Sequence, residues 1–262
     1  MASPIPKLLD ELLRDGQVRR APALSPPARR PLPTGVGALD AALGGGWMRG
    51  QLHELVGPPG AGGTALLRAA LAAATRAGEL CALIDPADAF DPAPADIDLE
   101  RLLWVRPKDA VTALRAAEIA LEARFALVAI DLGDVGCSAR WAPPVAGKAG
   151  SSGALPAPRL PKGVVQVVRF EVSRKAPRGA SPWARLQRRS EKHGGALLLL
   201  AREPQAGTFA AAVVELERGR VVWEGRQGAP GRFLRGTMPV GAVTRHKRMP
   251  PSAPLLLRLP LR

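Results

Sequence analysis

The stretch LHELVGPPGAGGTALLRAALAAATRAGELCALID, residues 52–85, decides the fold that we expect for this chain of 262 residues. Residues Leu52–Val56 predict a strand, and a loop rich in glycine and proline follows from Gly57. Alanine and leucine then predict a helix over residues 64–77, and a second apolar strand is expected over Leu80–Asp85. A strand, a helix and a strand in this order predict a parallel sheet with helices on both faces.

The same alternation of strands and helices continues along the chain. Apolar runs predict strands at Leu102–Arg106, Ala126–Asp131 and Ala196–Ala201, and helical patterns lie at about 110–124 and 182–192. A hairpin is predicted from Val213–Leu216 and Val221–Glu224, joined through residues 217–220. We therefore expect an α/β fold with a largely parallel central sheet and a C-terminal β-hairpin.

Proline-rich segments divide the chain outside this core. We expect a helix in residues 1–20, a proline-rich linker over 21–33, a core over 34–248 with a flexible loop at 141–163, and a basic tail over 249–262. Leucines in the first helix and in the tail are candidate contacts for a partner protein or for self-association. Folding of the helix back onto the core, and an unstructured tail, are the alternatives. The candidate partner-binding leucines are Leu8, Leu9, Leu12, Leu13, Leu255, Leu256 and Leu257.

Charge is distributed unevenly along the chain. Residues 1–136 hold 14 Lys and Arg against 17 Asp and Glu, whereas residues 137–262 hold 23 against 6. A GC-rich genome could explain abundant arginine, but it does not explain so few acids, so we expect the basic half to contact the DNA backbone without sequence readout and with strong salt dependence. The candidate DNA-binding residues are Arg159, Lys162, Arg169, Arg174, Lys175, Arg178, Arg185, Arg188, Arg189 and Lys192.

The loop GPPGAGGT, residues 57–64, has the phosphate-binding spacing G-x-x-x-x-G-K-[ST] at every defined position except the lysine. Gly63 stands in the lysine position, and it cannot bring a positive charge to the β- and γ-phosphates. Asp131 ends a predicted strand, where an acid would hold Mg²⁺. The degenerate nucleotide-binding set comprises Gly57, Gly62, Gly63, Thr64 and Asp131, and we expect neither ATP nor Mg²⁺ as a cofactor.

Other classes of site find little support in the sequence. The three histidines match no metal-ligand spacing with Cys81 or Cys137, and both thiols are expected to be reduced, as in a cytoplasmic protein. The chain begins without the pattern of a signal peptide, and no apolar stretch approaches the length of a membrane span. We therefore expect a soluble, nucleoid-associated protein without a metal site.

The order of elements from Thr34 to Pro92 resembles the opening of the RecA recombinase core. On that register the catalytic glutamate of RecA, which follows the second strand, falls on Ala87 in the run Asp85-Pro86-Ala87-Asp88. The chain is most similar to the ImuA family. The similarity rests on the RecA-like order of elements, the phosphate loop without its lysine, the run LDAALGGGW at residues 39–47 and the run RLQ at residues 185–187. Members of that family are RecA-like accessory proteins of bacterial SOS mutagenesis.

The resemblance implies a non-catalytic DNA-binding scaffold in translesion synthesis. It also implies an ImuB-type polymerase homologue as partner, an error-prone replicative-type polymerase indirectly, and RecA itself. Two alternatives stay open: a protein-only regulator resembling the cell-division inhibitor SulA, and a weakly active ATPase that receives its cation from Lys108 or from an arginine of a neighbouring molecule. A plain recombinase is disfavoured because ATP-gated assembly needs the groups that are missing here.

Overall fold

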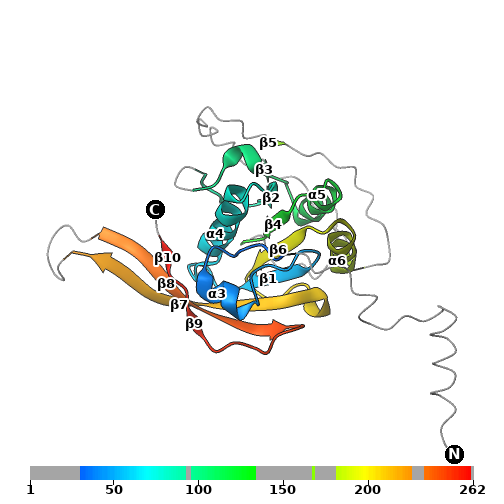
Figure 1. The fold of residues 1–262 in the computed structure, drawn as a ribbon. Helices are drawn as coiled ribbons and strands as arrows, with labels where there is room; N and C mark the ends of the chain where they lie inside the picture. The colour runs from blue at the N-terminus through cyan, green and yellow to red at the C-terminus, as the bar shows by residue number, and fades with distance from the viewer. Residues whose placement is uncertain (1–29, 93–95, 134–166, 169–180, 226–232, 261–262) are drawn as a thin grey trace, which may run out of the picture. The chain divides into compact units, whose positions relative to one another are not determined.

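One sheet of ten strands organises the described part of the chain (Figure 1). The computed structural model describes residues 30–92, 96–133, 167–168, 181–225 and 233–260. Within the sheet the strand order is β10-β8-β7-β1-β6-β4-β2-β3-β5, and β9 pairs with β8. The strands are β1 Leu52–Val56, β2 Cys81–Ile84, β3 Leu102–Val105, β4 Leu127–Asp131, β5 Val167–Val168, β6 Ala196–Ala201, β7 Ala210–Glu224, β8 Phe233–His246, β9 Leu255–Leu256 and β10 Leu259–Pro260.

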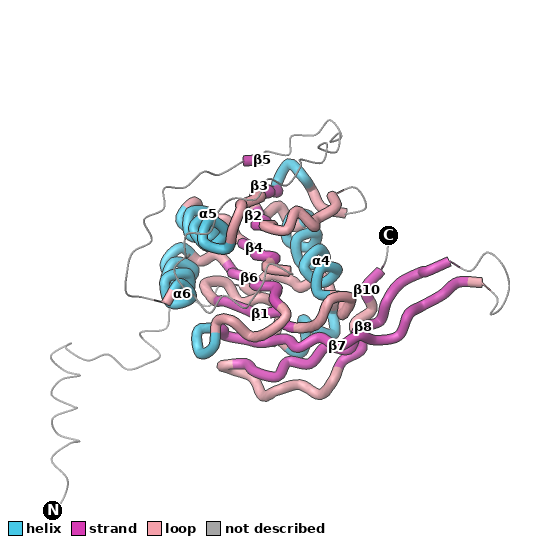
Figure 2. Tube along the Cα trace, turned by 180° about the vertical axis from the view of Figure 1, so that it is seen from behind, coloured by secondary structure: helices cyan, strands magenta, loops and turns pink. Residues whose placement is uncertain are grey.

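Helices cover both faces of the parallel part of this sheet (Figure 2). They are α3 Gly37–Ala42, α4 Gly63–Arg76, α5 Ala110–Glu122 and α6 Pro182–His193, with short 3-10 helices at Leu99–Arg101 and Gly207–Phe209. Leu83 of β2 faces the core that α4 completes, and the next residue, Ile84, faces the core of α5 and α6. A strand buried on both faces has no polar alternation, which explains the continuous apolar runs in the sequence. The predicted largely parallel α/β fold is confirmed.

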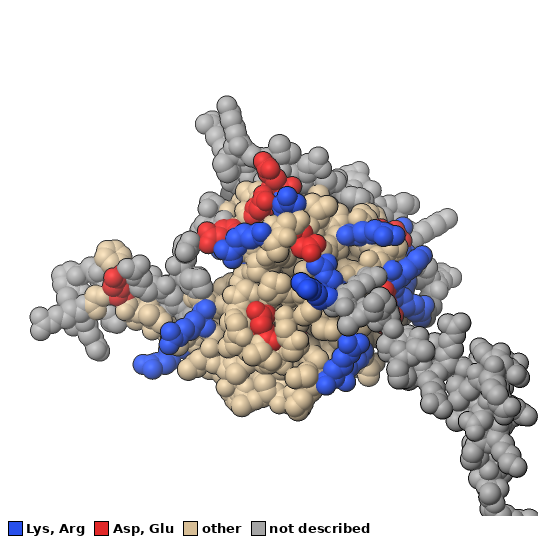
Figure 3. All heavy atoms as spheres, in the orientation of Figure 1, with Lys and Arg blue, Asp and Glu red and all other residues tan. Residues whose placement is uncertain are grey.

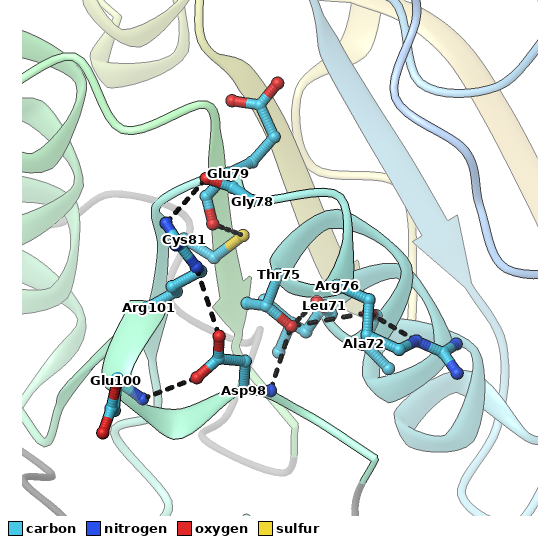
Figure 4. A network of polar contacts seen from close by, with 10 residues as sticks. All are labelled: Leu71, Ala72, Thr75, Arg76, Gly78, Glu79, Cys81, Asp98, Glu100 and Arg101. Atoms are coloured by element: carbon cyan, nitrogen blue, oxygen red, sulfur yellow. Dashed lines mark hydrogen bonds and ion pairs between the residues drawn. The ribbon is translucent and has the colours of Figure 1, made fainter.

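A polar network joins the end of α4 to the segment that enters β3 (Figure 4). The Thr75 hydroxyl donates to the Leu71 carbonyl at 2.8 Å and accepts from the Asp98 amide at 3.2 Å. Arg101 pairs with the Asp98 carboxylate at 3.2 Å and donates to the Gly78 carbonyl at 2.9 Å. Cys81 is buried beside this network as a free thiol, and burial raises its pKa to about 12. Cys81 is buried, as the sequence predicted, whereas Cys137 lies outside the described residues, and the reduced state of the two thiols stays a prediction.

The C-terminal hairpin differs from the predicted one. The segments Val213–Leu216 and Val221–Glu224 belong to the same long strand, β7, and its antiparallel partner β8 begins only at Phe233. The predicted turn at residues 217–220 is therefore wrong. This segment is a β-bulge, because the register with β8 shifts between Glu217 and Arg220. A Cβ atom at Gly219 would lie 1.8 Å from the Met238 carbonyl oxygen, so glycine there permits close approach of the two strands instead of a chain reversal.

Both predicted boundaries of the core need correction. Leu32, assigned to the linker, is 2% exposed and pairs with Trp47 through two backbone hydrogen bonds of 2.7 and 2.8 Å. The compact unit that contains the core therefore begins at Pro31. In the predicted tail, β9 and β10 both pair with β8, and Leu257 between them is fully buried. The tail thus completes the core because its leucines find an apolar surface on β8.

Candidate functional site

The phosphate-loop backbone is present between β1 and α4. Gly62 adopts a left-handed conformation with φ of +85° and precedes the first residue of α4, Gly63. The Leu66 amide donates to the Gly62 carbonyl at 2.9 Å, which begins the hydrogen bonding of the helix. Thr64 is exposed at this helix end. Backbone amides at a helix N-terminus can receive an anion, so the missing part of the motif is the side chain, not the loop.

An apolar side chain occupies the place where a lysine would begin. A Cβ atom at Gly63 would lie 2.6 Å from Cδ1 of Leu200, in the neighbouring strand β6. Leu200 is buried, with 8% of its surface exposed. A lysine at position 63 would therefore require the Leu200 side chain to move.

The C-terminal strands approach the same loop from the other side. A Cβ atom at Gly62 would lie 2.7 Å from Cγ of Pro239 and 3.0 Å from Cδ1 of Leu259. Leu259 belongs to β10, the strand that packs beside α4, and only 4% of its surface is exposed. Arg218 of β7 donates from Nε to the Pro59 carbonyl at 2.9 Å. The loop is thus packed against the chain's own C-terminal part, which sequence reasoning did not predict.

The two acids that follow β2, Asp85 and Asp88, both have structural partners. Asp85 is fully buried, and its carboxylate accepts hydrogen bonds from the amides of Ala89 at 3.1 Å and Phe90 at 2.9 Å. Asp88 forms an ion pair of 2.9 Å with Arg106. Asp85 therefore shapes the loop after β2, and its buried amide bonds leave it poorly placed to orient water.

Asp131 and Ala87 both lie near Gly133. A Cβ atom built on Gly133 would be 3.3 Å from Oδ1 of Asp131 and 3.9 Å from Cβ of Ala87. Asp131 is 7% exposed and ends β4, as the sequence predicted. The two positions of the degenerate site are therefore close in space, and the one that would carry the glutamate holds only a methyl group.

The basic side chains of the predicted helix α6 fall into two groups, of which the first pairs with acids of α5. Glu118 of α5 is buried and binds Arg185 at 2.9 Å, and Arg115 of its own helix approaches it at the same distance. Arg189 pairs with Glu118 at 3.8 Å and also with Glu122. Arg185 and Arg189 thus join α6 to α5.

Arg188 and Lys192, by contrast, are exposed on α6. Figure 3 shows Lys and Arg side chains gathered on the side of the molecule that α5 and α6 form. Both residues belong to the predicted DNA-binding set. Among the described residues of that set, they are exposed and form no ion pair with α5, unlike Arg185 and Arg189. The contact of any of them with DNA stays a prediction.

Two buried side chains, whose structural roles the sequence did not predict, position the surroundings of the site. The Glu54 carboxylate in β1 accepts from the amides of Gln205 at 2.7 Å and Ala206 at 2.8 Å, and so holds the loop that follows β6. The Gln187 side chain of the RLQ segment accepts from the Leu52 amide at 2.9 Å, which ties α6 to the start of β1. A polar residue inside an apolar strand was the only available signal for Glu54.

Several predicted residues lie outside the described part of the chain. They are Leu8, Leu9, Leu12, Leu13, Arg159, Lys162, Arg169, Arg174, Lys175 and Arg178. Of the tail leucines, Leu256 is 56% exposed and Leu255 is partly buried, whereas the buried Leu257 cannot contact a partner without leaving its core. Among the described residues, no cluster of three or more metal-ligating side chains occurs, and no helix has the length and apolarity to cross a bilayer.

Comparison with known proteins relates the first half of the chain to RecA. Residues 27–143 match the RecA N-terminal domain. RecA of Clavibacter michiganensis subsp. michiganensis is 38% identical over 125 residues, which are 46% of this chain and 33% of that protein. RecA of Picosynechococcus sp. is 36% identical over 104 residues, or 38% of this chain and 30% of that protein. The chain thus spans about a third of the length of these relatives.

The fold likeness extends further than the sequence match. The crystal structure of the RadB recombinase superposes with a TM-score of 0.55 at 17% identity, covering 87% of this chain and 95% of that one. The chain therefore has a RecA/RadB-like α/β fold, with a mostly parallel sheet and antiparallel strands at its C-terminal end.

Proposed function

We propose that this chain, related to RecA over residues 27–143, is a non-catalytic scaffold that binds DNA during SOS-induced translesion synthesis. The observation that carries the proposal is the phosphate loop. Gly63 replaces the lysine, Leu200 fills the space beside it, and Leu259 packs on the preceding glycine. A loop that has lost the lysine of the motif and carries apolar neighbours lacks the cation with which that motif stabilises phosphoryl transfer.

The resemblance to the ImuA family supplies the rest of this proposal. The scaffold would link DNA to an ImuB-type polymerase homologue, and through it to an error-prone replicative-type polymerase, and it would also contact RecA. The exposed Leu256 and the basic surface of α6 are available for such contacts. A protein-only regulator resembling SulA is the competing function, and the absence of DNA binding would favour it.

We expect the purified protein neither to bind nor to hydrolyse ATP with Mg²⁺. We also expect Gly63→Lys alone to produce no turnover, because Ala87 still offers no acid to orient water. Isothermal titration with a non-hydrolysable ATP analogue measures binding, and phosphate release measures turnover. Turnover that survives Asp131→Ala would identify a contaminating enzyme, whereas turnover abolished by Asp131→Ala would contradict the proposal.

A weakly active ATPase is a second candidate because of Arg218. Its guanidinium lies beside the loop, where Nε binds the Pro59 carbonyl and approaches the position of a Cβ on Gly60 at 3.8 Å. If Arg218 supplied the missing cation, nucleotide binding would be measurable and Arg218→Ala would abolish it. If the original protein bound nucleotide without hydrolysing it, and Arg218→Ala removed that binding, the loop would be assigned as a nucleotide sensor.

DNA binding should weaken steeply as salt rises, because backbone contacts release counterions. Replacing Arg188 and Lys192 together by alanine should lower the affinity about tenfold and reduce the salt slope by about 2. Fluorescence anisotropy with single-stranded and double-stranded DNA across a salt series measures both quantities. Arg76→Ala is the matched control, since Arg76 is an exposed base of α4 on the opposite face of the sheet. An affinity independent of salt would contradict backbone binding.

A further inference from the structure

The helices α5 and α6 end side by side, just before the neighbouring parallel strands β4 and β6 begin (Figure 2). A Cβ atom at Gly195, after α6, would lie 2.4 Å from the carbonyl oxygen of Phe125, after α5. The segments that follow the two helices are therefore in close contact. This contact brings Arg124, which follows α5, near Lys192 and His193, the last two residues of α6. We call these three residues the helix-end cluster.

The arginine of this cluster has a backbone conformation that glycine usually adopts. The φ angle of Arg124 is +64°, in the left-handed region, where a Cβ atom is unfavourable. Glycine occupies the equivalent position at the end of α4 and of α6, where φ is +85° at Gly78 and +82° at Gly194. Glycine ends a helix in this way without steric strain. An arginine in the same place indicates a role for its side chain beyond ending the helix.

Positive charge in the helix-end cluster is not neutralised by the acids around it. The arginine and the lysine are exposed, and among the described residues neither forms an ion pair. The segment before β1 also packs here, since the Gly50 amide donates to the Gly195 carbonyl at 3.0 Å. The acids of the surrounding elements have partners of their own. The pairs are Glu122 with Arg189, Glu79 with Arg49, and Glu191 with Gln187.

The histidine of the cluster is sensitive to these charges. Desolvation lowers the pKa of His193 below its usual 6.5, and the positive charges of Lys192, Arg124 and Arg189 lower it further. These charges come from α6 and from the end of α5, and all three are cationic. An anion bound among them would relieve their mutual repulsion.

We propose that the helix-end cluster binds a phosphate group of the DNA backbone and so extends the basic surface of α6 onto α5. This inference rests on the DNA binding proposed above, and it adds Arg124 and His193 to the residues that contact DNA. A guanidinium group can donate to two phosphate oxygens at once, and a protonated imidazole donates from both ring nitrogens. The second half of the chain, with 23 bases against 6 acids, complements a polyanion.

Phosphate binding at this cluster should make the affinity for DNA depend on pH. A phosphate beside His193 favours the charged imidazolium and raises its pKa. The protein then takes up a proton when DNA binds, so the affinity should rise as the pH falls from about 7.5 to about 5.5. By linkage, each unit of pKa change corresponds to a change in affinity of up to about tenfold.

NMR titration of the imidazole protons, with and without a single-stranded oligonucleotide, measures the two pKa values of His193 directly. The resonance is assigned by its loss in His193→Gln. We expect a free value below 6.5 and a rise of at least about one unit with DNA. If inorganic phosphate at the same phosphate concentration raised the pKa as far as DNA does, the cluster would bind free anions and the assignment to DNA would be wrong.

The variant Arg124→Gly separates a role in binding from a role in folding. It removes the charge and introduces the residue that the left-handed conformation favours. The urea midpoint of unfolding should not fall, whereas the affinity for DNA should fall about three- to tenfold and the salt slope by about 1. Arg76→Ala is the matched control, because Arg76 is an exposed base in the last turn of α4, on the opposite face of the sheet.

Two negative results have different meanings. An original protein that binds no DNA would overturn the proposed function together with this site. If the original protein binds DNA, an unchanged affinity in Arg124→Gly, or a pKa of His193 that DNA leaves unchanged, would overturn this site alone.

Discussion

Replacing Leu257 by alanine should lower the free energy of unfolding by about 2–5 kcal/mol, the range for a leucine removed from a close-packed core. Leu257 is fully buried, its amide donates to the Pro239 carbonyl at 2.8 Å, and its side chain covers Gly241 of β8. The loss arises from apolar contacts and from the cavity that the truncated side chain leaves.

Leu256→Ala is the control for this prediction, because the neighbouring leucine is 56% exposed. Its effect should stay within about 0.5 kcal/mol. Urea unfolding followed by circular dichroism measures both variants. Equal effects would mean that the C-terminal segment does not pack on β8. Loss of partner binding in Leu256→Ala without loss of stability would, in turn, assign the exposed leucine to docking.

Acidification should destabilise the fold by about 3 kcal/mol between pH 6.5 and pH 4 through His53 alone. His53 is fully buried in β1, and its Nε2 lies 3.1 Å from the Met48 carbonyl. Burial lowers its pKa from 6.5 to about 4, an effect that outweighs the hydrogen bond to Met48, while His246 lowers it slightly further. Protonation would place a second N–H at Nδ1, which has no described hydrogen-bond partner.

The direction of this effect follows from the two pKa values. The unfolded chain binds a proton near pH 6.5, whereas the folded chain binds it only near pH 4, so lowering the pH favours unfolding. The stabilisation is complete above pH 6.5 and is lost progressively down to pH 4. His53→Gln should remove this part of the pH dependence, and His193→Gln should not, since His193 lies near the surface of α6. Unfolding curves of the three proteins from pH 7 to pH 4 measure the difference, and parallel curves for the original protein and His53→Gln would show the prediction to be wrong.

Much of the fold could be predicted because it depends on local patterns. The run CALI is apolar throughout, as expected for a strand buried on both faces, LHELV is apolar except at His53 and Glu54, and the glycine-rich loop between β1 and α4 restricts the connection. The hairpin was misplaced because Gly219 and its charged neighbours have the composition of a turn. Whether glycine serves a turn or a close approach depends on the partner strand, here the Met238 carbonyl, which no local pattern reveals.

The candidate site divides in the same way. Three features of the site are visible in the sequence, because each depends on residue type at a known spacing. They are the glycine in the lysine position (Gly63), the acid at Asp131 and the missing acid at Ala87. The pairing of Arg185 with Glu118 depends on two helices that are distant in the chain. The burial of Asp85 against backbone amides depends on the path of the loop that follows β2. Spacing alone therefore overestimated how many of the basic side chains of α6 are available for DNA.

The sequence by itself determined the parallel core, the degenerate phosphate loop and the basic second half, because apolar periodicity, motif spacing and charge are local properties of the chain. Only the tertiary structure decided that Leu200, Pro239 and Leu259 crowd the phosphate loop, that Leu257 belongs to the core, and that the ends of α5 and α6 meet. Each of these depends on which distant segments share a surface, and the free energy that selects the arrangement comes from burying apolar area shared by both segments.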